Sequence, residues 1–266
     1  MTSEYKRIIT YIARAGYCAK CVVYSLLGGM IIYAALYAGS ADQISKKDIF
    51  QKIESSTFGS TILFLVFAGL ICYVIWRLIQ FILNPDDLDK HKPLDLITRF
   101  FYFISALLYA SVAYTAFKVL FNSQDTSKSK QTLTAEWLQH PLGVYLISGL
   151  GIIIIIFAGI QLKHAIKQDF MSKFDRSQLS QKQRKSILLS GRIGFIGRAI
   201  IYVIIGGFIT FAAINHNPSQ AGGLSEALVM ILNKPFGAYL LAAVGVAMLG
   251  FGIFCGFEGR YRAIKK

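Results

Sequence analysis

The chain repeats itself, and the repeat limits the fold more than any other feature. A shift of 178 positions places one set of residues onto an identical set: Arg14, Gly16, Tyr24, Gly28, Gly29, Ile31, Ala34 and Ala35 fall on Arg192, Gly194, Tyr202, Gly206, Gly207, Ile209, Ala212 and Ala213. A fainter middle copy is in phase, since Arg99, Tyr102 and Tyr109 match Arg14, Tyr17 and Tyr24. Such a period predicts one supersecondary unit used three times.

Each copy contains two long apolar runs. Of the 266 residues, 55% are apolar and 16% charged. About 20 residues of helix cross a hydrocarbon core of about 30 Å, and six runs reach that length: 17–38, 59–83, 96–121, 142–162, 193–214 and 237–257. Lipid offers no partner for a bare backbone N–H or C=O, so the runs must be helical. We therefore expect an all-α polytopic membrane protein, built as three helical hairpins around a pseudo-threefold axis.

The repeat also divides the chain. Copy one spans 1–83, copy two 84–162 and copy three 193–266, with a basic segment at 163–192 between the last two. This segment is partly amphipathic, and we expect it to rest on the inner leaflet. The outer connection within each copy carries a short amphipathic stretch, seen best at 224–232, which predicts a short interfacial helix before the next span.

The distribution of positive charge predicts the orientation. With six spans, 21 lysines and arginines fall on the side of the two chain ends and seven on the other. This bias predicts that both ends are cytoplasmic, in a bacterial inner membrane. The net charge of +14 then reflects topology and contact with anionic lipid. We expect no nucleic-acid partner, because no aromatic and basic motif lies in a soluble domain.

Three short motifs recur at equivalent places. They are Arg-x-Gly before each odd run (Arg14, Arg192), Tyr-x-x-x-Gly within it (Tyr24, Tyr202), and Pro-Phe-Gly or Pro-Leu-Gly before an even run. On these motifs the chain resembles a bacterial membrane family described as domain of unknown function 1206, with three tandem copies of a two-helix unit. The resemblance implies a fold and a membrane location, and it brings no activity with it. The second copy departs from the pattern, with Phe101 and Ala113 where the other copies have glycine.

The residues needed for catalysis, a metal or a cofactor are missing from the pattern. Cys18 and Cys21 have a C-x-x-C spacing, but no second pair and no following histidine accompany them. The four histidines lie near the ends of the runs, so none is placed to ligate haem inside the bundle. We expect a protein that is not an enzyme and needs no cofactor or metal.

Cations repeat at the inner ends of the odd runs. Arg14, Arg99 and Arg192 are equivalent, and Lys20 and Arg198 repeat one to two turns deeper. If the copies surround a threefold axis, these side chains could hold a phosphate or a lipid head group. Alternatively, they are anchors that extend outward to lipid phosphates.

Tyrosines repeat near the middle of the odd runs, and one acid lies near an inner end. Tyr24, Tyr109 and Tyr202 either line a pocket or pack between helices with each hydroxyl on a backbone carbonyl. We expect Glu258 to pair with Arg198, since a pair would neutralise a costly charge in the membrane.

Two classes of function remain. The first is a non-catalytic membrane protein that binds anionic lipid of the inner leaflet, another membrane protein or a second copy of itself. The alternative is a passive channel or carrier for a small solute along the pseudo-threefold axis. The helix centres carry no charged residue, which disfavours ion-coupled transport.

Overall fold

The structure is a computed structural model, and it describes residues 3–36, 51, 59–85, 88, 93–121, 141–175, 177, 179–215 and 224–263. Its elements, in chain order, are α1 (Ser3–Leu36), α3 (Gly59–Leu83), α4 (Pro93–Leu120), α6 (Pro141–Lys167), the 3-10 helix η2 (Asp169–Lys173), α7 (Gln181–Ile214), α8 (Leu224–Leu232) and α9 (Gly237–Tyr261). This part of the chain contains no strand, only an isolated bridge between Phe174 and Arg262.

Six of these helices are long and apolar enough to cross a membrane: α1, α3, α4, α6, α7 and α9. The predicted all-α architecture with six spans is confirmed. The second predicted run coincides with α3, whereas α1 and α7 begin well before the runs predicted at 17–38 and 193–214. Large apolar side chains such as Leu65, Tyr145 and Tyr239 remain exposed on the outer surfaces of the helices, as expected for surfaces that face lipid.

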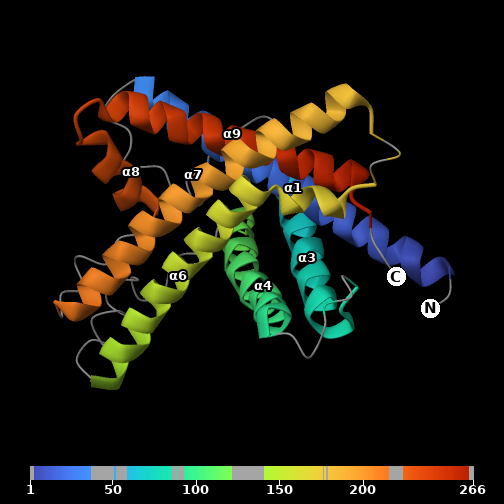
Figure 1. Cartoon of the computed structure of the whole chain (residues 1–266), viewed down its shortest axis with the longest axis horizontal. Coiled ribbons are helices and arrows are strands. Elements are labelled where there is room, and N and C mark those ends of the chain that lie inside the picture. Colours follow the sequence, from blue (N-terminus) through green and yellow to red (C-terminus); the bar gives the residue numbers. More distant parts are fainter. Residues whose placement is uncertain are drawn as a thin grey trace.

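The closest packing joins successive copies rather than the two helices of one copy. Antiparallel pairs are formed by α1 with α9, by α6 with α7 and by α3 with α4 (Figure 1). Contacts within a copy are less extensive for α1 with α3 and for α7 with α9, and they are sparse between the described residues of α4 and α6. The three main interfaces follow one rule, in which the second helix of a copy packs on the first helix of the next, and α9 closes the ring on α1. This cyclic order is the one that a pseudo-threefold arrangement requires.

Glycines permit two of these interfaces to be equally close. A Cβ atom on Gly28 would lie 2.7 Å from the carbonyl oxygen of Gly245, and one on Gly206 would lie 2.8 Å from that of Gly151. Gly28 and Gly206 are 178 positions apart, so the interfaces of α1 with α9 and of α7 with α6 share a register. Backbones come this close in lipid only where side chains are absent.

The neighbouring repeated glycines behave differently. Around Gly29 and Gly207 a Cβ atom would meet nothing within 4 Å. Of each repeated glycine pair, only the first residue serves helix packing.

The segment 163–192 is part of the helical bundle, which corrects its prediction as a separate linker between copies two and three. Its first residues complete α6, and its last residues form the first turns of α7. Between them, Phe170, Met171 and Phe174 are buried against a cluster that includes Phe195 and Phe254. The segment is amphipathic, and its apolar side packs on α7 and α9.

The short helix predicted at 224–232 is present as α8, which packs on the first part of α9 (Figure 1). Ala227 and Leu228 are fully buried in this contact. The chain then turns through Phe236, whose φ is 59°, and α9 begins at Gly237. The corresponding outer segments of copies one and two lie almost wholly outside the described residues.

A candidate site of buried cations and tyrosines

The three repeated tyrosines converge inside the bundle. The hydroxyl groups of Tyr24 and Tyr109 are 2.9 Å apart and share a hydrogen bond. Arg198 donates from Nη2 to the Tyr202 hydroxyl at 2.6 Å, and its guanidinium lies 5.7 Å from the centre of the Tyr24 ring. The hydroxyls therefore bond to one another and to a cation, whereas the packing alternative had placed them on backbone carbonyls.

The tyrosine rings border the apolar core. Tyr24, Tyr109 and Tyr202 all pack against a buried cluster that includes Leu27 and Leu70. The other members come from α1, α3, α4, α7, α8 and α9, so the cluster joins all three copies. The tyrosines thus mark the boundary between this apolar core and the polar groups that lie nearer the side of the two chain ends.

Lys20 lies at the centre of these polar groups. Its side chain is 3% exposed, and its ammonium group donates to the Tyr73 hydroxyl at 3.1 Å. Arg77 donates from Nε to the same hydroxyl at 2.7 Å and from Nη1 to Gln80 Oε1 at 3.0 Å. Because one oxygen accepts from both cations, their charged nitrogens are no more than about 6 Å apart, where two like charges repel by about 3 kcal/mol at an effective dielectric constant of about 20.

Aromatic ring faces surround the same charges. The Lys20 ammonium lies 4.5 Å from the centre of the Tyr73 ring and 5.2 Å from that of Phe251. The Arg198 guanidinium lies 4.3 Å from the centre of the same Phe251 ring. Cation–π contacts of this kind gain strength where water is excluded. Lys20 thus shares the Tyr73 hydroxyl with Arg77 and the Phe251 ring with Arg198, so it links the two arginines.

The aromatic packing follows the pseudo-threefold arrangement. Tyr24 meets Phe251 edge to face with ring centres 4.7 Å apart, and Tyr109 meets Tyr73 in the same way at 4.6 Å. Tyr73 and Phe251 are 178 positions apart in the repeat. In both contacts, the repeated tyrosine of one copy packs on the second helix of the preceding copy. We name Lys20, Tyr24, Tyr73, Arg77, Tyr109, Arg198, Tyr202 and Phe251 the cation–tyrosine cluster.

The three repeated arginines, Arg14, Arg99 and Arg192, do not belong to this cluster. Arg14 and Arg192 are exposed on α1 and α7. Arg99 donates to the carbonyl oxygen of Phe81 at 2.7 Å and thereby caps the end of α3. Among the described residues no contact joins the three arginines, so the idea that they share a ligand at a common point finds no support in the geometry.

The predicted pair of Arg198 with Glu258 is corrected by the structure. Glu258 Oε1 accepts from Arg262 Nη1 at 2.5 Å, one helical turn further along, and both side chains are buried. The prediction overlooked that Arg262 lies at i+4 on the same helix face, which is the closest position for a partner.

Tyr73, Arg77 and Arg262 were missed by the sequence analysis. Arg77 is the only cation between Gly59 and Leu83, so its position inside an apolar run was a usable signal. It does not repeat, because Gln161 and Cys255 occupy the corresponding positions in the other copies. A search for repeated residues therefore passes over it.

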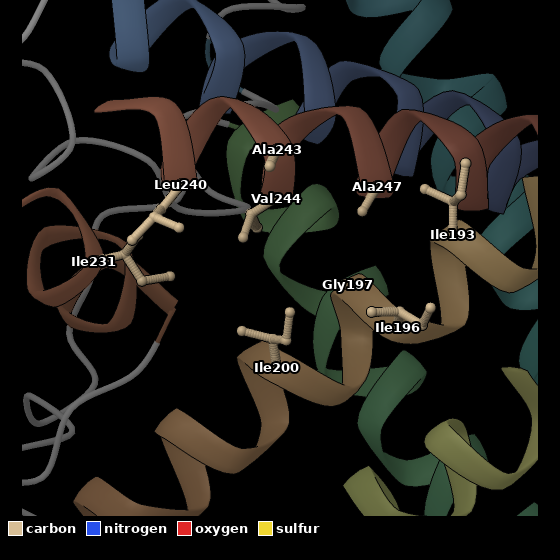
Figure 2. A pocket seen from close by; sticks show the side chains of 9 residues that line it. All are labelled: Ile193, Ile196, Gly197, Ile200, Ile231, Leu240, Ala243, Val244 and Ala247. Carbon is tan, nitrogen blue, oxygen red and sulfur yellow. The ribbon is translucent and has the colours of Figure 1, made fainter. Parts of the chain in front are cut away.

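A second feature is an apolar groove between α7 and α9. It has a volume of about 350 Å³, and Figure 2 shows its walls, with Ile231 of α8 at one end. Its lining is wholly aliphatic: Ile193, Ile196, Gly197, Ile200, Ile231, Leu240, Ala243, Val244 and Ala247. Such a lining suits a hydrocarbon chain and offers no polar group for catalysis.

Metal ligands do not gather in the described part of the chain, where no group of three or more His, Cys, Asp and Glu side chains could hold an ion. His164 contacts Asp169 at 2.5 Å and lies beside the Phe195 ring. Cys21 and Cys255 are free thiols at the packed face between α1 and α9.

Six apolar helices and a threefold repeat define a multi-pass membrane protein. The model of a family described as Domain of Unknown Function (DUF1206) matches three times, at residues 15–81, 100–168 and 193–262. The chain belongs to this family, as its motifs indicated. It is also 31% identical over 259 residues to the "Uncharacterized protein YxxB" of Bacillus subtilis (strain 168), a match that covers 97% of this chain and 93% of that protein. No solved structure matches it significantly.

Proposed function

We propose that this protein is a non-catalytic protein of the bacterial inner membrane that binds anionic phospholipid on the cytoplasmic side, where both chain ends would lie. The observation that carries the proposal is the continuity of the apolar groove with a basic surface on α7. One acyl chain would occupy the groove, and the phosphate would meet the cations at its inner end.

The face of α7 that lines the groove extends beyond it. Ile200, Ile196, Ile193 and Leu189 follow one another at spacings of three and four residues, and Lys182 lies seven residues, or about two turns, before Leu189. Leu189 is 63% exposed, so the apolar strip continues toward the inner end of the helix.

Exposed cations flank this strip where it leaves the hydrocarbon. Arg192 directly precedes Ile193, and Lys185 lies two turns further toward the inner end. Both side chains are exposed and can reach a phosphate, since long basic side chains extend toward head groups. Anionic lipid fits both parts of this surface, whereas a zwitterionic lipid would satisfy only the groove.

The core packing disfavours the channel alternative. A passive path along the axis would need water between the tyrosines and the outer side. The tyrosines instead pack against buried Leu27, Leu63 and Leu70. Binding to a membrane-protein partner would use the same exposed surfaces and is one outcome of the test below.

Native mass spectrometry of the full chain in neutral detergent tests the proposal. Phosphatidylglycerol should bind in preference to phosphatidylcholine, and the double change Arg192→Gln with Lys185→Gln should reduce that preference. Lys234→Gln is the matched control, because Lys234 is equally exposed but lies at the other end, next to α8. Equal binding of both lipids, or an unchanged preference in the double variant, would contradict it. Retention of a co-purified protein with no lipid preference would favour the partner alternative.

A second pair of variants tests whether the groove takes part in lipid binding. Ala243→Phe would fill the groove from an exposed position on α9, whereas Val246→Phe adds a ring on an exposed part of α9 outside the groove. We expect the first variant to bind less phosphatidylglycerol and the second to bind as the unchanged protein does. Equal binding by both variants would remove the groove from the site.

A further inference from the structure

We propose that the cation–tyrosine cluster binds a phosphate-class oxyanion inside the bundle, at Lys20, Arg77 and Arg198. This site is separate from the α7 surface of the lipid proposal, and it rests on different residues.

The cluster carries more positive charge than the acidic groups described around it can neutralise. Within the six apolar spans themselves, which begin after Glu4 in α1 and after Asp95 in α4, Glu258 is the one acidic residue. Its carboxylate is engaged by Arg262 at 2.5 Å. Lys20, Arg77 and Arg198 are held by tyrosine hydroxyls, an amide oxygen and ring faces. These partners solvate a cation but carry no formal charge, and uncompensated charge inside a membrane is costly.

Donors in the cluster remain open. The Arg198 Nε–H is buried and has no hydrogen-bond partner, although Nη2 of the same group bonds to Tyr202. Buried polar groups in native proteins nearly always have a partner, so an orphaned guanidinium donor points to a group that binds there. The Lys20 ammonium has three donors, of which Tyr73 accepts one.

Phe251 brings these two cations into one neighbourhood. Both the Lys20 ammonium and the Arg198 guanidinium lie over its ring, at 5.2 Å and 4.3 Å from the ring centre. Tyr24 approaches the same ring from its edge. An anion that meets both cations would accept from Arg198 Nε and from Lys20, and the hydrogen-bonded pair of Tyr24 and Tyr109 has one hydroxyl proton left to donate.

The donor set favours a tetrahedral oxyanion. Guanidinium groups match phosphate through paired hydrogen bonds, and an ammonium group adds a point charge. Arg77 and Arg198 are each partly exposed, so the cluster is not sealed on every side. The same chemistry is offered by inorganic phosphate and by the head group of a phosphatidate, and the experiment separates these two sources.

The test uses the full chain in neutral detergent, with the thermal unfolding midpoint followed at constant ionic strength. In one arm, inorganic phosphate replaces chloride; in the other, short-chain phosphatidic acid is compared with the diacylglycerol that lacks its phosphate. We expect a saturable rise of the midpoint in at least one arm. A rise with phosphatidic acid alone that persists in Arg192→Gln with Lys185→Gln would identify a lipid head group in the cluster, whereas a rise lost in that variant would belong to the α7 surface and overturn the proposal. A rise with inorganic phosphate would identify a free anion. No rise in either arm would overturn the proposal.

Variants then locate the site. Lys20→Gln and Arg198→Gln should each weaken the binding of the effective probe by about tenfold, because each removes a charge-assisted hydrogen bond. Lys234→Gln serves as the control, since this exposed lysine lies outside both the cluster and the α7 surface, and its loss should leave the binding of either probe unchanged. Undiminished binding in both cluster variants, or an equal loss in the control, would contradict the assignment.

A third measurement covers variants that fail to fold. Equilibrium dialysis of the unchanged protein against radiolabelled phosphate should give one bound anion per chain. Against labelled short-chain phosphatidic acid, uptake should remain when the α7 surface is removed by Arg192→Gln with Lys185→Gln. Arg198→Lys keeps the charge while removing the orphaned Nε–H, and it should bind more weakly without losing the site. Absence of uptake of both labels by the unchanged protein would refute the site without any variant.

Discussion

Gly69 on α3 lies against Ala19 on α1, and the third copy contains the same contact with the two residue types exchanged. A Cβ atom on Gly69 would lie 2.6 Å from the Cβ of Ala19. In the third copy, Gly197 on α7 faces Ala247 on α9, each 178 positions after its counterpart. Each interface has room for one methyl group, and the two copies place it on opposite helices.

This exchange predicts a rescue between two substitutions. Gly69→Ala should lower the free energy of unfolding by about 1–3 kcal/mol, because it forces a second methyl group into a packed contact. Adding Ala19→Gly recreates the arrangement of the third copy and should restore most of the loss. Unfolding by dodecyl sulfate titration in mixed micelles measures the double-mutant cycle. Losses that simply add would show that the two sites do not share one space.

The close approach of α1 and α9 gives a second prediction. Gly28→Val should destabilise the protein strongly, because a Cβ atom there meets the backbone of α9 at 2.6 Å. Gly29→Val is the adjacent control on the same helix, where a side chain meets open space. Both changes add the same side chain, so a large difference in unfolding midpoint isolates the interface. Similar midpoints would mean that the two helices do not pack at Gly28.

The buried pair of Glu258 and Arg262 gives a third prediction. Glu258→Gln leaves a buried guanidinium without its counter-charge, and removal of one partner from such a pair typically costs about 3–5 kcal/mol. Replacing both residues, as in Glu258→Gln with Arg262→Met, should recover part of that loss. The dodecyl sulfate titration again provides the measurement. A single variant as stable as the unchanged protein would indicate that solvent reaches the pair.

Trp76 reports on a fourth contact. Its indole N–H donates to the Tyr17 hydroxyl at 3.1 Å, and both side chains are 1% exposed. Tyr17→Phe removes the acceptor and should cost about 1–3 kcal/mol, since a buried donor loses its partner. In a Trp137→Phe background, Trp76 is the sole tryptophan, and its emission should move to shorter wavelength. Unchanged emission would imply another acceptor for the indole.

The architecture could largely be predicted from the sequence because its causes are local or periodic. The length of the apolar runs predicted the six spans, and Pro235 and Gly237 indicated where α8 ends and α9 begins. The inward extensions of α1 and α7 were missed, because polar residues such as Lys182 and Arg184 end an apolar run without ending a helix.

The site was only partly predictable, for a physical reason. The repeat identified Lys20, Arg198 and the three tyrosines, because a ring of similar copies places equivalent residues near the axis. It gave no sign of Arg77 or of the pairing of Glu258, since each depends on a residue present in one copy only. Which buried charges pair depends on distances of a few ångströms between side chains. Comparison of the repeated copies identifies equivalent residues but gives no such distances.

The closure of α9 on α1 has a consequence for biogenesis. During synthesis α1 is made before the other spanning helices described, but its most extensive partner is the last of them, α9. Until α9 arrives, Lys20 has no Phe251 ring above it, and the surface of Gly28 is open. The early helices must therefore wait in an incomplete state, and insertion of α9 is the step that seals the bundle. A truncated product would expose a charged, glycine-lined seam, the kind of lesion by which membrane quality control can recognise an unfinished chain.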